Sequence, residues 1–179
     1  MVRVFVALEL SGGIREALER AQEMLRRCSA RLTFVEPKNI HITVKFLGEV
    51  DESNLPAVVD ALKKIDFHAF SVSAGQVTLN NPRQPRTAWC AIDDAGHGGE
   101  LLRQIENALS PLGFERETRR FTPHATVARV KSPDPSLVSA IQRMSDTTYG
   151  SCTIRGMKLK KSTLTPLGPV YEDLLEVTW

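Results

Sequence analysis

A segment that occurs twice, 83 positions apart, most constrains how this chain can fold. HITVKFLGEVDESNLPAVVDAL begins at residue 41, and HATVARVKSPDPSLVSAIQRM begins at residue 124. Each copy starts with alternating apolar and polar residues, as in a half-buried strand, and passes through a turn into apolar residues at helical spacing. At this offset His41 falls on His124 and Thr43 on Thr126. The repeat therefore predicts two similar structural units.

Each copy continues with a Gly-containing strand, a Pro-rich connection and another strand, which gives strand–helix–strand–strand twice. The expected strands cover residues 2–8, 41–48, 70–79, 87–92, 124–130, 151–159 and 171–177, and the expected helices cover 14–28, 55–65, 101–112 and 135–144. Hairpin-like strand pairs favour antiparallel sheets over a parallel one. We expect an α+β fold with one bilobal domain over residues 1–179. Two pseudo-symmetric lobes, each an antiparallel sheet with outer helices, would face each other across a central cleft.

Composition removes several classes of protein. The 179 residues are 42% hydrophobic and 25% charged, which is ordinary for a globular chain, and a net charge of +2 permits an acidic ligand without indicating extensive duplex binding. Cys28, Cys90 and Cys152 show no paired spacing, which favours free thiols in a reducing compartment. The apolar run in MVRVFVALEL is too short for a membrane span and lacks a signal cleavage site. These features predict a cytoplasmic protein, and a monomer is the default expectation.

The polar residues of the repeated strand carry the chemistry. Side chains two apart on a strand share a face, so His41 and Thr43 point the same way, as do His124 and Thr126. If the lobes are related by a pseudo-twofold axis, both pairs converge on one cleft. The core side is expected to take the intervening apolar residues, Ile42, Val44 and Phe46 in the first copy and Ala125 and Val127 in the second.

Two facing imidazoles suit acid–base catalysis near neutral pH. With an unperturbed pKa of about 6.5, one ring can take a proton from water while the other gives one to a leaving oxygen. Such a pair suits displacement at phosphorus, since attacking and leaving oxygens lie on opposite sides. The Thr hydroxyls would donate hydrogen bonds to non-bridging phosphate oxygens, and the scheme uses no metal and no cofactor.

The chain resembles the two-histidine (2H) phosphoesterases, and within them the RNA 2′,3′-cyclic phosphodiesterases, formerly called 2′-5′ RNA ligases. The resemblance covers nearly the whole chain and is carried by RVFVA (3–7), NIHITVKFLG (39–48) and FTPHATVAR (121–129). It implies the bilobal fold described above. It also implies metal-free hydrolysis of a terminal 2′,3′-cyclic phosphate to a 2′-phosphomonoester, with reversible 2′-5′ joining of RNA ends. The implied partners are RNA ends or small nucleotides that carry this cyclic phosphate.

The resemblance also implies roles for single residues. His41 is the proton donor to the departing 3′ oxygen and His124 the proton acceptor that activates water, although the residues alone leave the two interchangeable. Thr43 and Thr126 are phosphate ligands. Arg129 is a further phosphate contact, but its odd offset from His124 turns it away from the cleft unless a bulge restores it.

Other residues are candidates for contacts with an RNA strand. Lys45 lies four residues after His41, so in a regular strand it shares the face of His41. A basic rim for an RNA backbone could comprise Lys158, Lys160, Lys161, Arg83 and Arg86. Aromatic residues that could stack a base are Phe5, Phe46, Trp89 and Tyr171. His68 and His97 lack a Thr two residues later, and we interpret both as surface residues.

Two alternative functions remain open from the sequence. A non-catalytic module could bind nucleotides or RNA ends with the same His and Thr side chains, although binding phosphate does not need two titrating groups. A metallohydrolase could use His41, His124 and a carboxylate, but the sequence has no HxH or HExxH and no acidic cluster near either motif.

Overall fold

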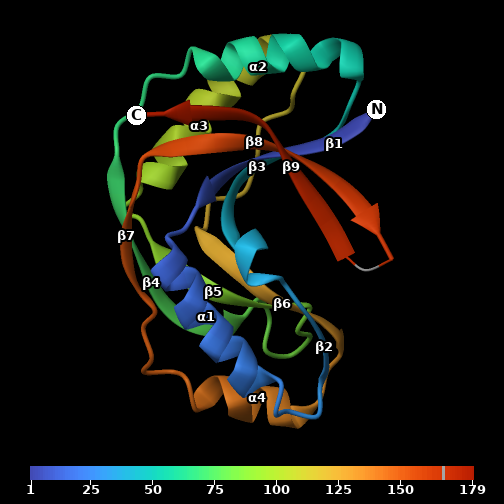
Figure 1. Cartoon of the computed structure of the whole chain (residues 1–179), viewed down its shortest axis with the longest axis vertical. Helices are drawn as coiled ribbons and strands as arrows, with labels where there is room; N and C mark the ends of the chain where they lie inside the picture. Colours follow the sequence, from blue (N-terminus) through green and yellow to red (C-terminus); the bar gives the residue numbers. More distant parts are fainter. Residues whose placement is uncertain (167) are drawn as a thin grey trace.

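The computed structural model describes residues 1–166 and 168–179 and has the α+β architecture expected from the sequence (Figure 1). Its strands are β1 (Val2–Glu9), β2 (Arg31–Phe34), β3 (His41–Val50), β4 (Phe70–Leu79), β5 (Thr87–Asp93), β6 (His124–Ser132), β7 (Gly150–Ile154), β8 (Gly156–Thr165) and β9 (Gly168–Thr178). Its α-helices are α1 (Gly12–Leu25), α2 (Leu55–Lys63), α3 (His97–Leu109) and α4 (Pro135–Gln142). Short 3-10 turns cover Pro37–Asn39, Glu52–Asn54 and Ser110–Leu112.

The two histidine strands lie at the centre of a curled antiparallel sheet. Within the described residues the strand order is β7-β4-β5-β6-β3-β1-β8-β9, with β2 paired to β6. Strands β3 and β6 are joined by a single described residue pair, Ile42 with Ala125. The antiparallel arrangement predicted for each lobe is confirmed. The two lobes are not separate sheets, however, because this junction makes them halves of one sheet.

The two halves of the sheet exchange strands relative to the order in the sequence. Strands β4 and β5 follow β3 in the chain but lie beside β6, whereas β8 and β9 follow β6 and lie on the β3 side, beyond β1. The sequence repeat predicted the strands of each lobe but not this exchange. As a result, β6 is flanked by β5 from the first part of the chain, and β8 and β9 from the second part extend the sheet on the β3 side beyond β1.

The single strand expected over residues 151–159 is wrong: β7 and β8 are separate strands. Strand β7 pairs with β4 in one half of the sheet, and β8 pairs with β1 in the other, so the chain crosses between halves at Arg155. Gly156 permits this crossing, because a Cβ at this position would overlap the carbonyl oxygen of Val177. The short strand β2 was not predicted, since four residues provide too weak an alternation to identify a strand.

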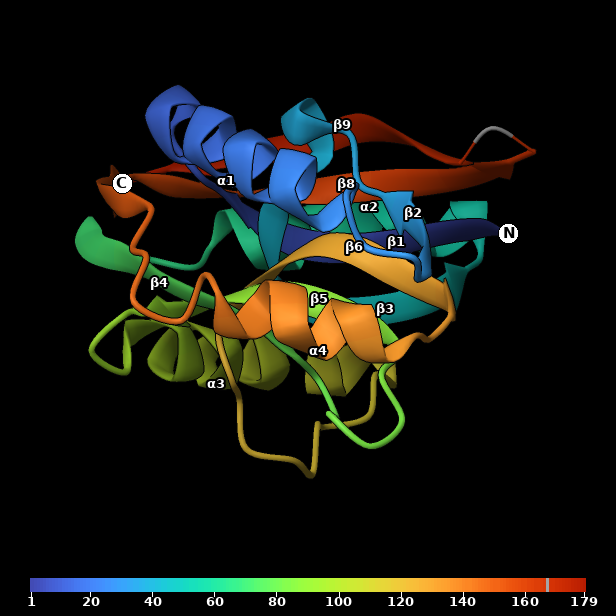
Figure 2. The same cartoon turned by 90° about the horizontal axis from the view of Figure 1, so that it is seen from below.

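The helices cover the outer faces of the sheet. Helix α1 contacts α4, and α2 contacts α3. Figure 2 shows α1 and α3 at opposite sides of the molecule. Helix α1 begins where expected, since the Ser11 hydroxyl accepts a hydrogen bond from the backbone N–H of Ile14 (3.3 Å) and caps its first turn. Among residues 1–166 and 168–179, no helix has the length and apolar character needed to cross a bilayer.

Candidate active site

The junction between β3 and β6 brings the two His-x-Thr motifs together. Ile42 and Ala125 are paired and both are buried in the core. In an antiparallel pair this register places His41 opposite Thr126 and Thr43 opposite His124. Because neighbouring residues on a strand point to opposite faces, all four polar side chains lie on the face away from the Ile42–Ala125 core contact. The expected convergence therefore takes place between adjacent strands of one sheet.

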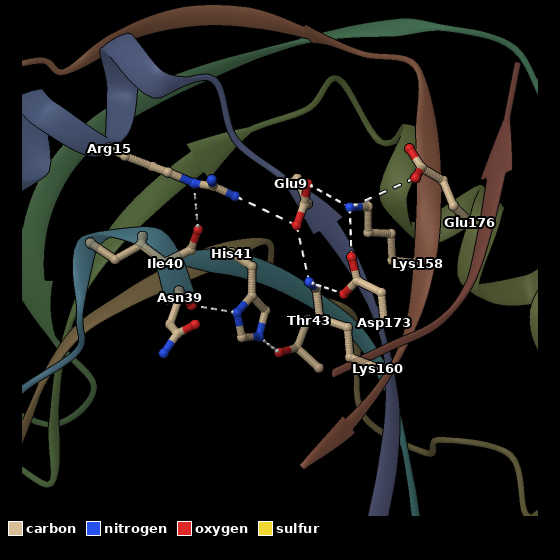
Figure 3. Close-up of polar contacts among 10 residues, drawn as sticks. All are labelled: Glu9, Arg15, Asn39, Ile40, His41, Thr43, Lys158, Lys160, Asp173 and Glu176. Carbon is tan, nitrogen blue, oxygen red and sulfur yellow. Dashed lines mark hydrogen bonds and ion pairs between the residues drawn. The ribbon is translucent and has the colours of Figure 1, made fainter. Parts of the chain in front are cut away.

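The His41 ring is fixed by two hydrogen bonds (Figure 3) and by contacts with two aromatic side chains. Its Nδ1 lies 2.7 Å from the carbonyl oxygen of Asn39, which can only accept, so Nδ1 carries a proton. Its Nε2 lies 3.0 Å from the Thr43 hydroxyl. The ring stacks on Phe5 with centroids 5.1 Å apart and meets Tyr171 edge-on at 5.6 Å. These contacts hold Nε2 toward the hydroxyl of its own motif.

The surroundings of His41 favour its neutral form. Burial is the main cause and lowers the pKa of the imidazole to about 4, against the opposing effect of the Asn39 carbonyl. The positive charges of Lys160 and Arg15 also lower this pKa, and the Glu9 carboxylate raises it. A phosphate anion in contact with Nε2 would favour the protonated form by direct charge attraction.

His124 has the same local geometry in a different environment. Its Nδ1 lies 2.7 Å from the carbonyl oxygen of Thr122, so Nδ1–H donates and the neutral ring has its lone pair on Nε2. The ring lies 4.0 Å from the Trp89 ring, centroid to centroid. Burial lowers the pKa of His124, and the Thr122 carbonyl opposes this effect. A neutral imidazole with its Nε2 lone pair available has the form required of a general base.

A network of ion pairs lies on the strands beside His41 (Figure 3). Glu9 is the cross-strand partner of His41, and its carboxylate lies 3.0 Å from Lys160 Nζ and 3.2 Å from Lys158 Nζ. Both lysines also bind Asp173, and Arg15 lies 3.7 Å from Glu9. Two of the lysines predicted to form a basic rim are thus neutralised by carboxylates. Lys161 is likewise 3.6 Å from Glu172, whereas Arg83 and Arg86 are exposed.

A β-bulge in each histidine strand changes which residues share the face of the His and Thr side chains. In β6, Trp89 pairs with Thr126 but Ala88 pairs with Ala128, so Val127 is an extra residue. Val127 and Ala128 are consequently both buried, and Arg129 returns to the face of His124 and Thr126. Arg129 also lies close enough to Tyr171 to oppose the rise in phenol pKa that burial causes.

The same bulge in β3 reverses two of the predicted orientations. Ala7 pairs with Thr43 but Val6 pairs with Lys45, so Val44 is extra and Lys45 turns inward. Lys45 is buried and its Nζ lies 3.2 Å from Glu106 and 2.8 Å from the carbonyl oxygen of Glu115, so it does not share the face of His41 and Thr43. Phe46, predicted to face the core, is 66% exposed and packs against Phe5.

The two histidines predicted to lie outside the site do so. The rings of His68 and His97 contact each other edge-on. His68 also stacks on Phe67, and His97 packs against Phe70. His68 is exposed, but His97 is half-buried and so is not the surface residue expected. Among the residues that the structure describes, no three His, Cys, Asp or Glu side chains are grouped so that they could hold a metal ion.

Comparison with known proteins places this geometry in a family. The model of the LigT-like phosphoesterases matches residues 8–89 and 95–171, and each segment contains one of the two His-x-Thr motifs. The chain belongs to the LigT-like phosphoesterase family. The RNA 2′,3′-cyclic phosphodiesterase of Archaeoglobus fulgidus is 36% identical to it over 97% of this chain and 98% of the relative. The enzyme of that name from Methanothermobacter thermautotrophicus is 34% identical, with coverages of 97% and 96%.

Solved structures share the fold of this LigT-like phosphoesterase. A crystal structure of a Thermus thermophilus protein superposes with a TM-score of 0.83, at 26% identity over 98% of this chain and 97% of the other. The crystal structure of E. coli LigT complexed with 3′-AMP gives a TM-score of 0.81 at 20% identity, with coverages of 99% and 97%.

Sequence reasoning missed several groups at the site of this LigT-like phosphoesterase. Glu9 ends the first strand and becomes the partner of His41 only through the β1–β3 register. The backbone carbonyls of Asn39 and Thr122 bind the two Nδ1 atoms. Every residue type has a backbone carbonyl, so the residue types at these positions do not reveal the contacts. One signal was available, because each carbonyl belongs to the residue two positions before its histidine.

Proposed function

We propose that this chain is an RNA 2′,3′-cyclic phosphodiesterase that hydrolyses a terminal 2′,3′-cyclic phosphate to a 2′-phosphomonoester. The observation that carries the proposal is the register between β3 and β6, which sets each histidine opposite the threonine of the other motif. The names of the Archaeoglobus and Methanothermobacter relatives support the substrate class.

In the proposed reaction the two imidazoles act on opposite sides of phosphorus. His124 Nε2 takes a proton from water as its oxygen bonds to phosphorus, and protonated His41 gives its Nε2 proton to the departing 3′ oxygen. Thr43 and Thr126 donate hydrogen bonds to non-bridging oxygens, and Arg129 offsets their charge. The Nδ1–H contact of His124 with Thr122 leaves its Nε2 unprotonated in the neutral ring, as a base requires. His41 has the equivalent contact with Asn39, so the choice of His124 as base and His41 as acid follows the family resemblance.

Protonation of His41 is the demanding step of this scheme. The protein alone favours neutral His41, so we propose that the phosphodiester anion supplies the charge that raises the imidazole pKa when substrate binds. The stack with Phe5 and the bond to Asn39 hold the ring still in either state. The mechanism requires neither a metal ion nor a cofactor.

The same chemistry run with an alcohol in place of water would join RNA ends through a 2′-5′ bond, and we include this reversible ligation in the proposal. The proposed substrates are RNA ends or small nucleotides with a 2′,3′-cyclic phosphate. We further propose that residues 1–179 act as one domain and as a cytoplasmic monomer.

Product analysis on an RNA that ends in a 2′,3′-cyclic phosphate tests the proposal. The expected product is the 2′-phosphate, and formation of the 3′-phosphate or no reaction would exclude it. His41→Ala and His124→Ala should each lower turnover by roughly 100- to 10,000-fold. A module that only binds RNA ends would show no turnover in the parent protein. Loss of activity in EDTA with recovery in zinc would instead establish a metallohydrolase.

A further inference from the structure

The sheet differs on the two sides of the catalytic histidines. Beside His41, the cross-strand partner is Glu9, and the adjoining surface is occupied by the ion pairs of Lys158 and Lys160 with Asp173 (Figure 3). Beside His124, the cross-strand partner is Ala91. Ala91 borders a hollow of about 420 Å³ whose lining includes Ser73, Gly75, Ala91, Asp93, Thr148 and Ser151. On the His41 side a smaller hollow of about 170 Å³ is lined by charged side chains, among them Glu9, Lys158 and Glu176. The larger and less charged space next to the site is therefore on the His124 side.

The hollow opens on the catalytic face of the sheet. Directly paired residues of antiparallel strands share a face, so Ala91 lies on the face of His124. Asp93 lies two residues further along β5 on that face, Asp93 pairs with Ser73, and Ser73 pairs with Ser151. The β4 strand has a bulge between Ala74 and Val77, and Gly75, within this bulge, has no side chain to fill the hollow. Small side chains thus extend the face of His124 across three further strands.

The chemistry of the hollow suits a neutral ligand rich in hydroxyl groups. Ser73 and Ser151 form a hydroxyl–hydroxyl hydrogen bond of 2.9 Å and both are exposed, so each retains capacity for another partner. Asp93 accepts one bond from the N–H of Ala95 and is also exposed. The described residues that line the hollow include this carboxylate and no cation, which disfavours phosphate and favours sugar hydroxyls. Its volume is within the usual range for ligand pockets, roughly 300–1,000 Å³.

We propose that this hollow, hereafter the acceptor hollow, binds the nucleoside at the 5′-hydroxyl end of a second RNA strand. The inference rests on the proposed function, in which His124 activates the attacking oxygen. With a nucleoside seated beside His124, its 5′-hydroxyl takes the place of water. The 5′ oxygen bonds to phosphorus and passes its proton to His124, while the bond to the 3′ oxygen breaks and His41 protonates that oxygen. One phosphodiester and one alcohol are converted into another phosphodiester and alcohol, with no further reactant.

The test compares two alcohols in one reaction. Adenosine 2′,3′-cyclic phosphate is incubated with a 5′-hydroxyl dinucleotide and methanol together, and the 2′-5′-linked product, the methyl ester and the hydrolysis product are separated by chromatography. Methanol has no nucleoside that could occupy the hollow. Its transfer therefore measures how far a substitution changes the reaction at phosphorus itself. In Ser73→Tyr and Ser151→Tyr, we expect the ratio of dinucleotide to methanol transfer to fall at least tenfold. Ser139→Tyr, on the exposed face of α4, should keep the parent ratio.

Each outcome separates the inference from the proposed function. An unchanged ratio in both hollow variants would overturn the inference. A higher KM for the cyclic nucleotide with an unchanged ratio would also overturn it, since the hollow would then bind the donor nucleoside. Hydrolysis without any dinucleotide product from the parent protein would refute the acceptor hollow while the phosphodiesterase stands. No hydrolysis at all would refute the proposed function itself.

Discussion

Lys45 and Phe46 show how one extra residue inverts a strand pattern. Simple alternation from His41 directs Phe46 to the core and Lys45 to the cleft, but the bulge at Val44 places Lys45 against Glu106 and leaves Phe46 66% exposed. The Lys45 and Glu106 side chains are only 8% and 10% exposed. Together they bind the backbone of Glu115 and Glu117, in the segment that leads to His124.

The sequence suggests that replacing Phe46 destabilises the protein more than replacing Lys45, and the structure predicts the reverse. Lys45→Met leaves the Glu106 carboxylate buried without its cation and should lower the free energy of unfolding by about 3 kcal/mol. Phe46→Ala removes a mostly exposed ring and should cost less than about 1 kcal/mol. Equilibrium unfolding in urea measures both. Similar losses for the two variants would show that the inward position of Lys45 is wrong.

His41 should make stability depend on pH. Its pKa is about 4 in the folded protein and about 6.5 when unfolded, so between these values the unfolded chain binds more protons. Stability from this group is therefore complete above pH 6.5 and is lost as pH falls toward 4. Between pH 7 and pH 5 the loss should be about 2 kcal/mol. Urea unfolding of the parent and of His41→Asn at both pH values measures it, and an equal pH dependence in the two proteins would contradict the assignment.

At the scale of elements, local pattern predicted most strands and helices but not their partners. Alternation located β3, β4, β5 and β6, since each buries one face. The division of residues 151–159 between β7 and β8, and the exchange of strands between halves, depend on register with strands far away in the sequence. The β6 bulge that returns Arg129 to the face of His124 is equally non-local, because it is defined against β5. The sequence identified such a bulge as a condition for Arg129 and could not locate it.

Gln22 connects α1 to this bulge. Its side-chain amide is 2% exposed and donates to the carbonyl oxygens of Val35 (2.7 Å) and Val127 (2.9 Å), the latter being the extra residue of β6. Gln22→Ala removes both donors from buried carbonyls and should lower the free energy of unfolding by about 2 kcal/mol. Gln142→Ala, at an exposed position of α4, is the matched control and should change it by less than about 0.5 kcal/mol. Chemical denaturation compares the two variants, and equal effects would show that the two hydrogen bonds of Gln22 do not stabilise the fold.

At the scale of the whole molecule, the repeat predicted that the two motifs would converge but not that their surroundings would differ. The motifs are nearly identical in sequence, and the difference between them arises from their neighbours. His41 lies against Phe5, Tyr171 and the charges around Glu9, whereas His124 lies beside Trp89 and Ala91. Phe5, Glu9, Trp89 and Ala91 come from strands that flank β3 or β6 directly, whereas Tyr171 and the other charged residues come from β8, β9 and α1. Burial and charge around each ring are thus properties of the assembled sheet.

This asymmetry predicts different pH dependences for kcat/KM and kcat. The kcat/KM profile reports groups in the free enzyme, where burial lowers the pKa of both imidazoles, so its maximum should lie on the acid side of pH 7. The kcat profile reports the complex, in which the phosphodiester anion raises the pKa of His41. The alkaline limb of kcat should therefore lie at higher pH than that of kcat/KM. Steady-state rates from pH 4 to pH 10 on a cyclic-phosphate RNA measure both profiles. Coincident alkaline limbs would show that substrate does not protonate His41, and a rate that rises steadily through pH 9 would exclude His41 as the acid.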